Sequence, residues 1–367
     1  HMKLFNKIKF NDDKISLFKN KKMKKLLIFG GTFDPIHNGH IKMLSGAIKK
    51  IQPDLSLIIP TKNPPLKDSS PTASSKDRVA MINLAIANIP KVKVCDYEIK
   101  SKSNSKSYTY LTIKYLKNIY KNYQLYFLVG MDRLNDFDQW KNYKQILKNV
   151  TLVVAGRDNQ KAKFSNAIRL SVDETNISSK QLRKLPNKKY LNFNIVKYIA
   201  KNGVYAQSQI KSLMSDYRYQ HTLRVAKTAL EICSIKNKNL AKKAYIAAMY
   251  HDVAKEFNRD QILELLGNKF NRKRFPTAHT LHGCASAVYV KENFFITDKE
   301  ILDAIYNHVI PPKKPSILSK IIYCADKLEP ARTKKDIPNR TKLLALAKTN
   351  LNKAYEEVLA YNKSRFN

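Results

Sequence analysis

Two histidines follow a short apolar run and a pair of glycines near the start of the chain. The run at residues 24–31 ends in Gly30 and Gly31, and His37 and His40 come soon after them. The glycines let the backbone turn sharply and approach a ligand, and two histidines three positions apart share one face where a helix begins. Free amides and the positive end of the helix dipole gather there, which suits a polyphosphate. Two imidazoles at that point could stabilise charge on a pentavalent phosphorus and its leaving pyrophosphate; the alternative is two ordinary polar residues of a loop.

Five of the eight histidines fall between residues 221 and 308, in stretches with helical periodicity. His251 and Asp252 have apolar neighbours, which predicts an ionisable pair in the middle of a buried helix. Such a pair is costly unless it is paired or binds a metal. Nitrogen and oxygen ligands without a thiolate suit Fe, Mn or Mg better than structural zinc. The other members of the predicted cluster are His221, His282, His308 and Asp326. For any one of them alone, a hydrogen-bonded core residue is the alternative, and His279 is interpreted as structural.

The secondary-structure elements that must position these side chains change from alternating strands and helices to helices alone along the chain. Apolar runs predict buried strands, and amphipathic segments between them predict helices. The predicted strands are residues 24–31, 55–60, 92–99, 125–130 and 150–156, and the helices between them include 78–89 and 110–120. Beyond about residue 207 only helical periodicity remains, at residues 221–235, 240–257, 283–295, 299–309 and 343–363. We therefore expect an α/β Rossmann-like domain with a parallel sheet, followed by an all-α domain.

Composition at the start of the chain and this change of period together divide it into three parts. Residues 1–22 are a Lys- and Asn-rich extension that begins with a tag scar, residues 23–206 form the α/β domain, and residues 207–367 form the helical domain. The four cysteines are widely spaced with no CxxC pair, which favours a reducing compartment and predicts a cytoplasmic protein. A membrane span is not expected, because the sequence has no run of about 18 apolar residues.

The chain is strongly basic, with 68 Lys and Arg residues against 29 Asp and Glu residues and a formal net charge of +39. Such an excess could indicate nucleic acid, an anionic membrane surface or phosphate-rich substrates. The lysines are spread over the whole chain and no nucleic-acid recognition module is evident, so we interpret most of the excess as compositional background. Any binding of nucleic acid is expected to be non-specific; an RNA-binding protein is the alternative from a different functional class.

The segment at residues 30–40, GGTFDPIHNGH, resembles the GxFDPxHxGH signature of the HxGH nucleotidyltransferase superfamily. It resembles the bacterial nicotinate-nucleotide adenylyltransferases in particular, because His37 stands where pantetheine-phosphate adenylyltransferases carry Thr. The resemblance covers about residues 23–205 and includes Ser107-Tyr108-Thr109, Gly130-Met131-Asp132, Trp140-Lys141 and the run 177–183, ISSKQLR. It implies transfer of adenylyl from ATP to nicotinate mononucleotide, giving deamido-NAD and pyrophosphate in NAD biosynthesis, with Mg²⁺ brought by ATP.

The resemblance also implies roles for individual residues. His37, His40 and Arg183 would be catalytic. The ATP-binding set would be Gly30, Gly31, Thr32, Phe33, His37, His40, Ser178 and Arg183. The nicotinate-nucleotide-binding set would be Tyr108, Thr109, Asp132 and Trp140, with Lys67 as a candidate phosphate contact. Lys180 departs from the family pattern, in which a threonine is usual, and a core aromatic is the alternative for Trp140.

Four segments of the helical part resemble the HD-domain phosphohydrolase superfamily, and most closely the bacterial symmetrical bis(5′-nucleosyl)-tetraphosphatases. They are RYQHTLRVA at 218–226, YHDVAKE at 250–256, LHGCASA at 281–287 and CADKLEPAR at 324–332. The resemblance implies metal-dependent hydrolysis of dinucleoside polyphosphates, such as diadenosine tetraphosphate, to ADP, with one or two Fe or Mn ions. The implied metal ligands are His221, His251, Asp252, His282, His308 and Asp326, with Asp252 also catalytic.

Two further features qualify this second resemblance. Lys255 and Arg332 are candidate phosphate contacts, although each could equally be a solvated surface charge. After His308 the chain continues with Val309 and, two residues later, prolines, whereas the family usually has Thr and Gly. The resemblance therefore indicates the hydrolysis reaction more firmly than it indicates the substrate. The alternative function is an active adenylyltransferase joined to a regulatory nucleotide-sensing or other nucleotide-hydrolysing HD domain.

Overall fold

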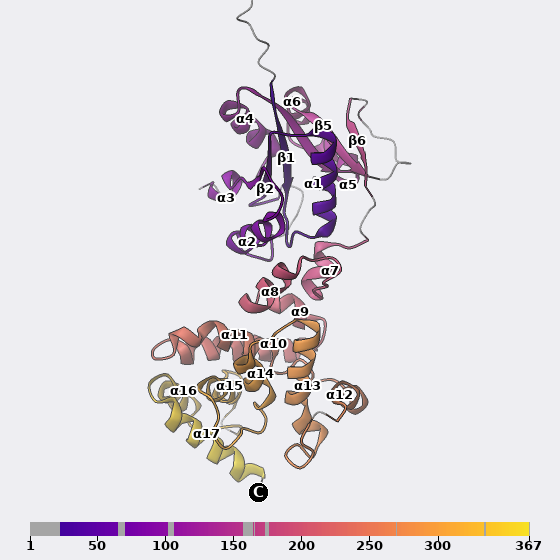
Figure 1. Cartoon of the computed structure of the whole chain (residues 1–367). Coiled ribbons are helices and arrows are strands. Elements are labelled where there is room, and N and C mark those ends of the chain that lie inside the picture. Colours follow the sequence, from indigo (N-terminus) through magenta and orange to yellow (C-terminus); the bar gives the residue numbers. More distant parts are fainter. Residues whose placement is uncertain are drawn as a thin grey trace, which may run out of the picture.

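The computed structural model describes residues 23–64, 70–101, 106–156, 164, 166–172, 176–268, 270–333 and 335–366. Lys67 and the predicted extension at residues 1–22 lie outside the described residues. Figure 1 shows an α/β body that carries a sheet, and a second body made of helices.

Six parallel strands form the sheet of the first body. They are β1 (Lys24–Gly31), β2 (Leu55–Pro60), β3 (Val92–Val94), β4 (Tyr123–Gly130), β5 (Thr151–Gly156) and β6 (Ile168–Ser171). Their order across the sheet is β3-β2-β1-β4-β5-β6, and every neighbouring pair is parallel. The predicted α/β fold with a parallel sheet is confirmed.

The predicted strand at residues 92–99 is wrong beyond Val94. β3 lies at the edge of the sheet, with Val94 opposite Ile58 of β2, and the chain then forms the short helix α3 (Tyr97–Lys100). In this register Asp96 would face Pro60, which has no amide hydrogen to donate, so the ladder cannot continue. The sequence pattern does not predict β6, because only one of its four residues is buried.

Helices cover both faces of the sheet. In chain order they are α1 (Asn38–Ile51), α2 (Ser75–Ile86), α4 (Thr109–Ile119), α5 (Met131–Asn135), α6 (Tyr143–Asn149), α7 (Ser179–Lys184) and α8 (Phe193–Asn202). Side chains of β1 alternate between the two faces. Leu27 and Phe29 pack with residues of α1, α2 and α8, whereas Leu26 and Ile28 pack with residues of α4 and α6.

β1 lies where the strand order reverses, between β2 and β4. In open parallel sheets, ligands bind in the crevice at this point, beyond the carboxyl ends of the strands. β1 ends at Gly31 and α1 begins at Asn38, so the segment that carries His37 lies at this crevice.

The second body is helical, as predicted. Its helices are α9 (Ala206–Lys211), α10 (Asp216–Cys233), α11 (Ala241–Tyr250), α12 (Arg259–Leu266), α13 (Ala278–Asn293), α14 (Lys299–Tyr306), α15 (Ile317–Leu328), α16 (Arg340–Thr349) and α17 (Leu351–Phe366). One apolar core takes side chains from all of them except α12. Near residue 206 the chain passes from the first core, in which Tyr205 packs, to the second, in which Ala206 and the earlier Ala200 pack.

Two ligand positions differ from the prediction. α11 ends at Tyr250, so His251 and Asp252 lie in the turn that follows the helix and not in its middle. The backbone N–H of Lys255 donates to the carbonyl of Asp252 at 3.0 Å, a bond that spans only three residues and tightens the chain. His308 likewise follows α14 and does not lie on it. Hydrophobic periodicity cannot separate such a turn from a continuing helix.

The predicted helix at residues 343–363 is two helices, divided at Asn350. The backbone of Asn350 leaves the helical conformation, with φ −140° and ψ 78°, and its side-chain oxygen accepts a hydrogen bond from the N–H of Lys353 at 3.2 Å. This cap satisfies an amide at the start of α17. No helix in the described part of the chain is long and apolar enough to cross a membrane.

Candidate active sites

His37 and His40 form a reciprocal capping box at the start of α1. Nδ1 of His37 accepts a hydrogen bond from the backbone N–H of Gly39 at 3.2 Å, and Nδ1 of His40 accepts one from the backbone N–H of His37 at 3.2 Å. An Nδ1 atom that accepts a hydrogen bond carries no proton, so the proton of each neutral ring lies on Nε2. Burial lowers the pKa of His37 to about 4, which keeps this ring neutral at physiological pH. The capping box therefore leaves each ring with an Nε2–H group as a donor, and the two ring centroids lie 3.8 Å apart.

The loop before His37 is held by the buried carboxylate of Asp34. Its oxygens accept hydrogen bonds from the backbone N–H groups of Thr72 and Ala73 at 2.8 and 3.0 Å. The hydroxyl of Tyr205 donates to the same carboxylate at 2.8 Å. Sequence reasoning missed Asp34 and Tyr205, although Asp34 lies inside the matched motif and a charged residue next to a proline and a phenylalanine is a signal of a buried, paired carboxylate.

Arg183 lies beside this loop. Its Nη1 donates to the backbone carbonyl of Asp34 at 2.6 Å and lies 3.5 Å from the Asp34 carboxylate. Nearby, the hydroxyl of Ser179 donates to the carbonyl of Pro35 at 2.9 Å. These contacts dock the start of α7 against the histidine loop, so residues 144 to 149 positions apart in sequence meet at one site.

A cavity of about 310 Å³ opens beyond the ends of β1 and β4. It is lined by six predicted ligand contacts: Gly30, Gly31, Thr32, Tyr108, Thr109 and Trp140. The Trp140 ring packs 4.9 Å from that of Phe137, and its Nε1 is buried without a hydrogen-bond partner in the described residues. A buried indole N–H usually has a partner, so this donor supports a ligand in the cavity.

Six predicted residues do not line this cavity: the three described above, His37, His40 and Arg183, and also Phe33, Asp132 and Ser178. The Phe33 side chain is buried and packs edge-on against the His40 ring at 5.2 Å, so it supports the histidine from behind. The Asp132 side chain is 80% exposed beside Arg133. Ser178 is exposed, and its hydroxyl accepts a hydrogen bond from the backbone N–H of Gln181 as the cap of α7.

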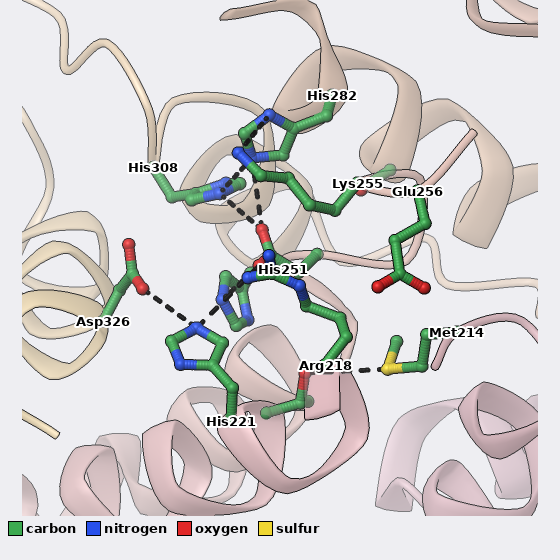
Figure 2. Close-up of polar contacts among 12 residues, drawn as sticks. Met214, Arg218, His221, His251, Lys255, Glu256, His282, His308 and Asp326 are labelled. Carbon is green, nitrogen blue, oxygen red and sulfur yellow. Dashed lines mark hydrogen bonds and ion pairs between the residues drawn. The ribbon is translucent and has the colours of Figure 1, made fainter. Parts of the chain in front are cut away.

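The second site brings the predicted metal ligands together, and all of them are buried: His221, His251, Asp252, His282, His308 and Asp326. Asp252 lies between two pairs of histidines. One carboxylate oxygen is 3.8 and 3.6 Å from Nε2 of His221 and His251. The other is 3.1 and 3.3 Å from Nε2 of His282 and His308. Figure 2 shows the two pairs of rings converging from opposite sides, with Asp326 next to His221.

The remaining ring nitrogens orient these histidines. Nδ1 of His251, His282 and His308 lies 2.6, 2.6 and 2.7 Å from the backbone carbonyl oxygen three residues earlier. A carbonyl only accepts, so each Nδ1 carries the proton and each Nε2 keeps its lone pair for a metal. Nε2 of His251 is buried without a hydrogen-bond partner in the described residues, and Nε2 of His221 lies 3.1 Å from Oδ1 of Asp326. The donor set fits a divalent cation, with Asp252 common to two groups of candidate ligands.

Charge at this site is balanced by cations. Burial alone would raise the pKa of Asp252, but its contacts with His251, His282 and His308 hold that pKa well below its ordinary value. Asp326 also has a pKa well below its ordinary value despite burial, chiefly because of Lys327. Arg218 donates to Asp252 at 2.8 Å, a contact that sequence reasoning missed. Both carboxylates are therefore ionised and ready to bind a cation.

A cavity of about 580 Å³ borders the cluster. Lys255 and Arg332, the candidate phosphate contacts, line it together with His279 and the apolar run 309–311. Burial lowers the pKa of Lys255, whose Nζ lies 3.4 Å from Nδ1 of His279. Arg332 already donates one hydrogen bond from Nη2 to the carboxylate of Asp326, at 3.0 Å. The cavity thus joins a cationic wall to an apolar one.

Glu329 is a supporting residue that sequence reasoning missed. Its carboxylate lies 3.1 Å from Nδ1 of His221 and accepts a hydrogen bond from Arg224 at 2.6 Å. Replacing Glu329 with glutamine is expected to weaken metal binding about 10–100-fold, because the carboxylate fixes the ring and increases its basicity. Metal titration monitored by thermal unfolding checks this, and an unchanged affinity would contradict it. An Arg224→Lys variant, which keeps the carboxylate, is the milder control.

The fold and the two sites define a nucleotidyltransferase-like domain joined to an HD domain. Family models agree: the cytidylyltransferase-like model matches residues 28–185 and the HD domain model matches residues 218–331. A Mycoplasma genitalium protein named "Probable nicotinate-nucleotide adenylyltransferase/Ap4A hydrolase" is 37% identical, over 92% of this chain and 97% of its own length. A Mycoplasma pneumoniae protein of the same name is 32% identical, over 92% of this chain and 99% of its own length.

The chain therefore belongs to the family of these two-domain proteins. A solved structure from Clostridium acetobutylicum, titled "predicted HD superfamily hydrolase involved in NAD metabolism", is 29% identical, covers 44% of this chain and 86% of that chain, and has a TM-score of 0.39.

Proposed function

We propose that the chain is a bifunctional enzyme. Its first domain transfers adenylyl from ATP to nicotinate mononucleotide, giving deamido-NAD and pyrophosphate. Its second domain hydrolyses dinucleoside polyphosphates, such as diadenosine tetraphosphate, to ADP. The observation that carries the proposal is that one chain holds two sites. One is a histidine capping box that follows the glycines lining a cavity, and the other is a buried cluster of histidines and aspartates beside a second cavity. The relatives of similar length are named for the same pair of activities.

In the first domain, transfer rests on positioning and electrostatics. The ATP phosphates would lie at the start of α1, where Nε2–H of His37 and of His40 donate to their oxygens. Arg183 would hold them from the side of α7. The pyridine ring would stack on Trp140, with Tyr108 and Thr109 beside the substituent of the ring. The phosphate of the mononucleotide then attacks the α-phosphorus and pyrophosphate leaves; Mg²⁺ brought with ATP would offset charge on the phosphates.

In the second domain, His221, His251, Asp252 and Asp326 would hold one ion, and Asp252, His282 and His308 a second. We propose Fe or Mn, because the ligands are imidazole and carboxylate without thiolate. When bound, the ions would supply Lewis acidity and a water of lowered pKa. Lys255 lies at the cavity wall, where it would hold a phosphate oxygen. Arg218 keeps Asp252 ionised and oriented at 2.8 Å.

We further propose that the domains divide near residue 206, because Tyr205 packs in the first core and Ala206 already packs in the second. The four cysteines are free thiols, which supports the predicted cytoplasmic location.

Two product assays test the function. With ATP and nicotinate mononucleotide, the full chain is expected to release deamido-NAD and pyrophosphate. With Fe or Mn, it is expected to cleave diadenosine tetraphosphate to two ADP. Products of ATP and AMP would contradict symmetrical cleavage, whereas nucleotide binding without turnover would favour a sensor role for the second domain.

A further inference from the structure

Glu98, on α3, is a carboxylate in the wall of the first cavity to which no role has been given. Its Oε1 accepts a hydrogen bond from the hydroxyl of Thr112 at 2.7 Å. Its Oε2 is buried and has no hydrogen-bond partner in the described residues. A buried carboxylate oxygen without a partner is costly, and one that borders a cavity can be satisfied by a ligand.

The lining of this cavity contains a single carboxylate among the described residues. The other charged groups are Lys106, Arg133 and Lys141, and the ammonium of Lys141 lies 4.5 Å over the Tyr108 ring. The buried guanidinium of Arg78 lies behind the cavity wall and donates to the carbonyls of Thr32 and Thr61, at 2.8 Å each. Burial raises the pKa of Glu98, although the hydroxyls of Thr112 and Ser107 and the charge of Arg78 oppose this. Its ionised form therefore gains from a cation that enters the cavity.

The mononucleotide substrate proposed above carries such a cation. Its ring nitrogen is bonded to the ribose, which makes the ring a pyridinium with a formal positive charge. Trp140, in the same lining, offers an aromatic face, which also attracts cations. One anionic oxygen and one aromatic face thus match the charge and the shape of a pyridinium ring.

We propose that Glu98 is a specificity-determining residue that selects the positively charged pyridinium ring of the mononucleotide through Oε2. This inference rests on the proposed adenylyl transfer and names the chemical feature that its second substrate must have. Mononucleotides of similar shape with an uncharged ring, such as a reduced dihydropyridine, are discriminated against because they leave Oε2 buried without a partner.

The test compares the full-length parent with Glu98→Gln, which keeps the shape and the acceptor for Thr112 but removes the charge. Ligands are nicotinate mononucleotide, nicotinamide mononucleotide and the reduced form of the latter, whose dihydropyridine ring is uncharged. Trp140 is the sole tryptophan, so quenching of its fluorescence gives Kd, and steady-state rates give KM and kcat. Glu98→Asp retains a carboxylate, and Glu292→Gln, an exposed site in the other domain, is the matched control.

Glu98→Gln is expected to raise Kd and KM for the two pyridinium mononucleotides about tenfold. Kd for the reduced form and KM for ATP should stay within about twofold, and Glu98→Asp should recover part of the loss. Equal weakening of the charged and reduced ligands would overturn the proposal, because it would indicate packing or a ribose contact. Unchanged Kd values would also overturn it. If the parent forms no deamido-NAD, the proposed transfer itself fails, which is a separate result.

Discussion

Replacing Asp252 with asparagine is expected to lower hydrolysis of diadenosine tetraphosphate at least about a thousandfold, because the metal-dependent stabilisation it supports is worth several kcal/mol. One oxygen of Asp252 faces His221 and His251 and the other faces His282 and His308. Asparagine has the same shape but no charge. Its amide group would donate hydrogen bonds to the Nε2 lone pairs of one histidine pair, occupying the atoms that a metal needs.

The loss should be confined to the second activity. Asp252 belongs to the helical body, and the first site is built from residues that pack in the sheet domain, so adenylyl transfer is expected to stay within about twofold. Elemental analysis of the purified parent and variant, with both product assays, measures all three quantities. Asp260→Asn, an exposed carboxylate on α12, is the matched control. A variant that keeps its metal and its hydrolysis would show that Asp252 is not a ligand.

The ligand cluster could be predicted from sequence because its members are chemically distinctive. Histidines are rare in this chain, and an adjacent His251 and Asp252 among alanines need a partner or a metal. The parallel sheet could be predicted for a similar reason, since continuous apolar runs separated by amphipathic helices have few other solutions. Both arguments use patterns within short segments of sequence, which do not depend on contacts between distant parts of the chain.

The supporting contacts could not be predicted, because they join residues far apart in sequence. Glu329 reaches His221 across 108 positions, and Tyr205 reaches Asp34 across 171. Neither residue differs locally from an ordinary surface Glu or core Tyr. The placement of Asp132 outside the cavity lining has the same cause: it depends on how the chain leaves β4, which a short motif does not encode.

The orientation of the histidine rings also could not be predicted from the sequence. At α1 the Nδ1 atoms accept hydrogen bonds and leave Nε2–H donors, which suit phosphate. At the second site the Nδ1 atoms of three histidines face carbonyls and leave Nε2 lone pairs, which suit a metal. The same side chain thus serves anion binding in one domain and cation binding in the other, and backbone geometry decides which.

Because the His40 ring is a hydrogen-bond donor, its removal is the second change with a large expected effect. His40→Ala is expected to lower kcat for deamido-NAD formation about a hundred- to a thousandfold, as the loss of one preorganised donor to a developing anion does elsewhere. The variant removes the Nε2–H donor of His40 and also frees the N–H of His37, whose ring lies 3.8 Å away. KM for ATP should change less than kcat, because the donor is worth most when charge builds up on the departing pyrophosphate.

Loss of the capping box alone cannot account for such a change. Removing a helix cap costs about 1 kcal/mol of unfolding free energy, which shifts the thermal midpoint but leaves the chemistry of a folded site intact. Asn258→Ala removes the cap of α12 in the other domain and is expected to lower stability without affecting transfer. Hydrolysis by His40→Ala should remain at the parent rate, since its site lies in the helical body. A kcat within about tenfold of the parent would mean that His40 only caps α1 and does not bind the phosphates.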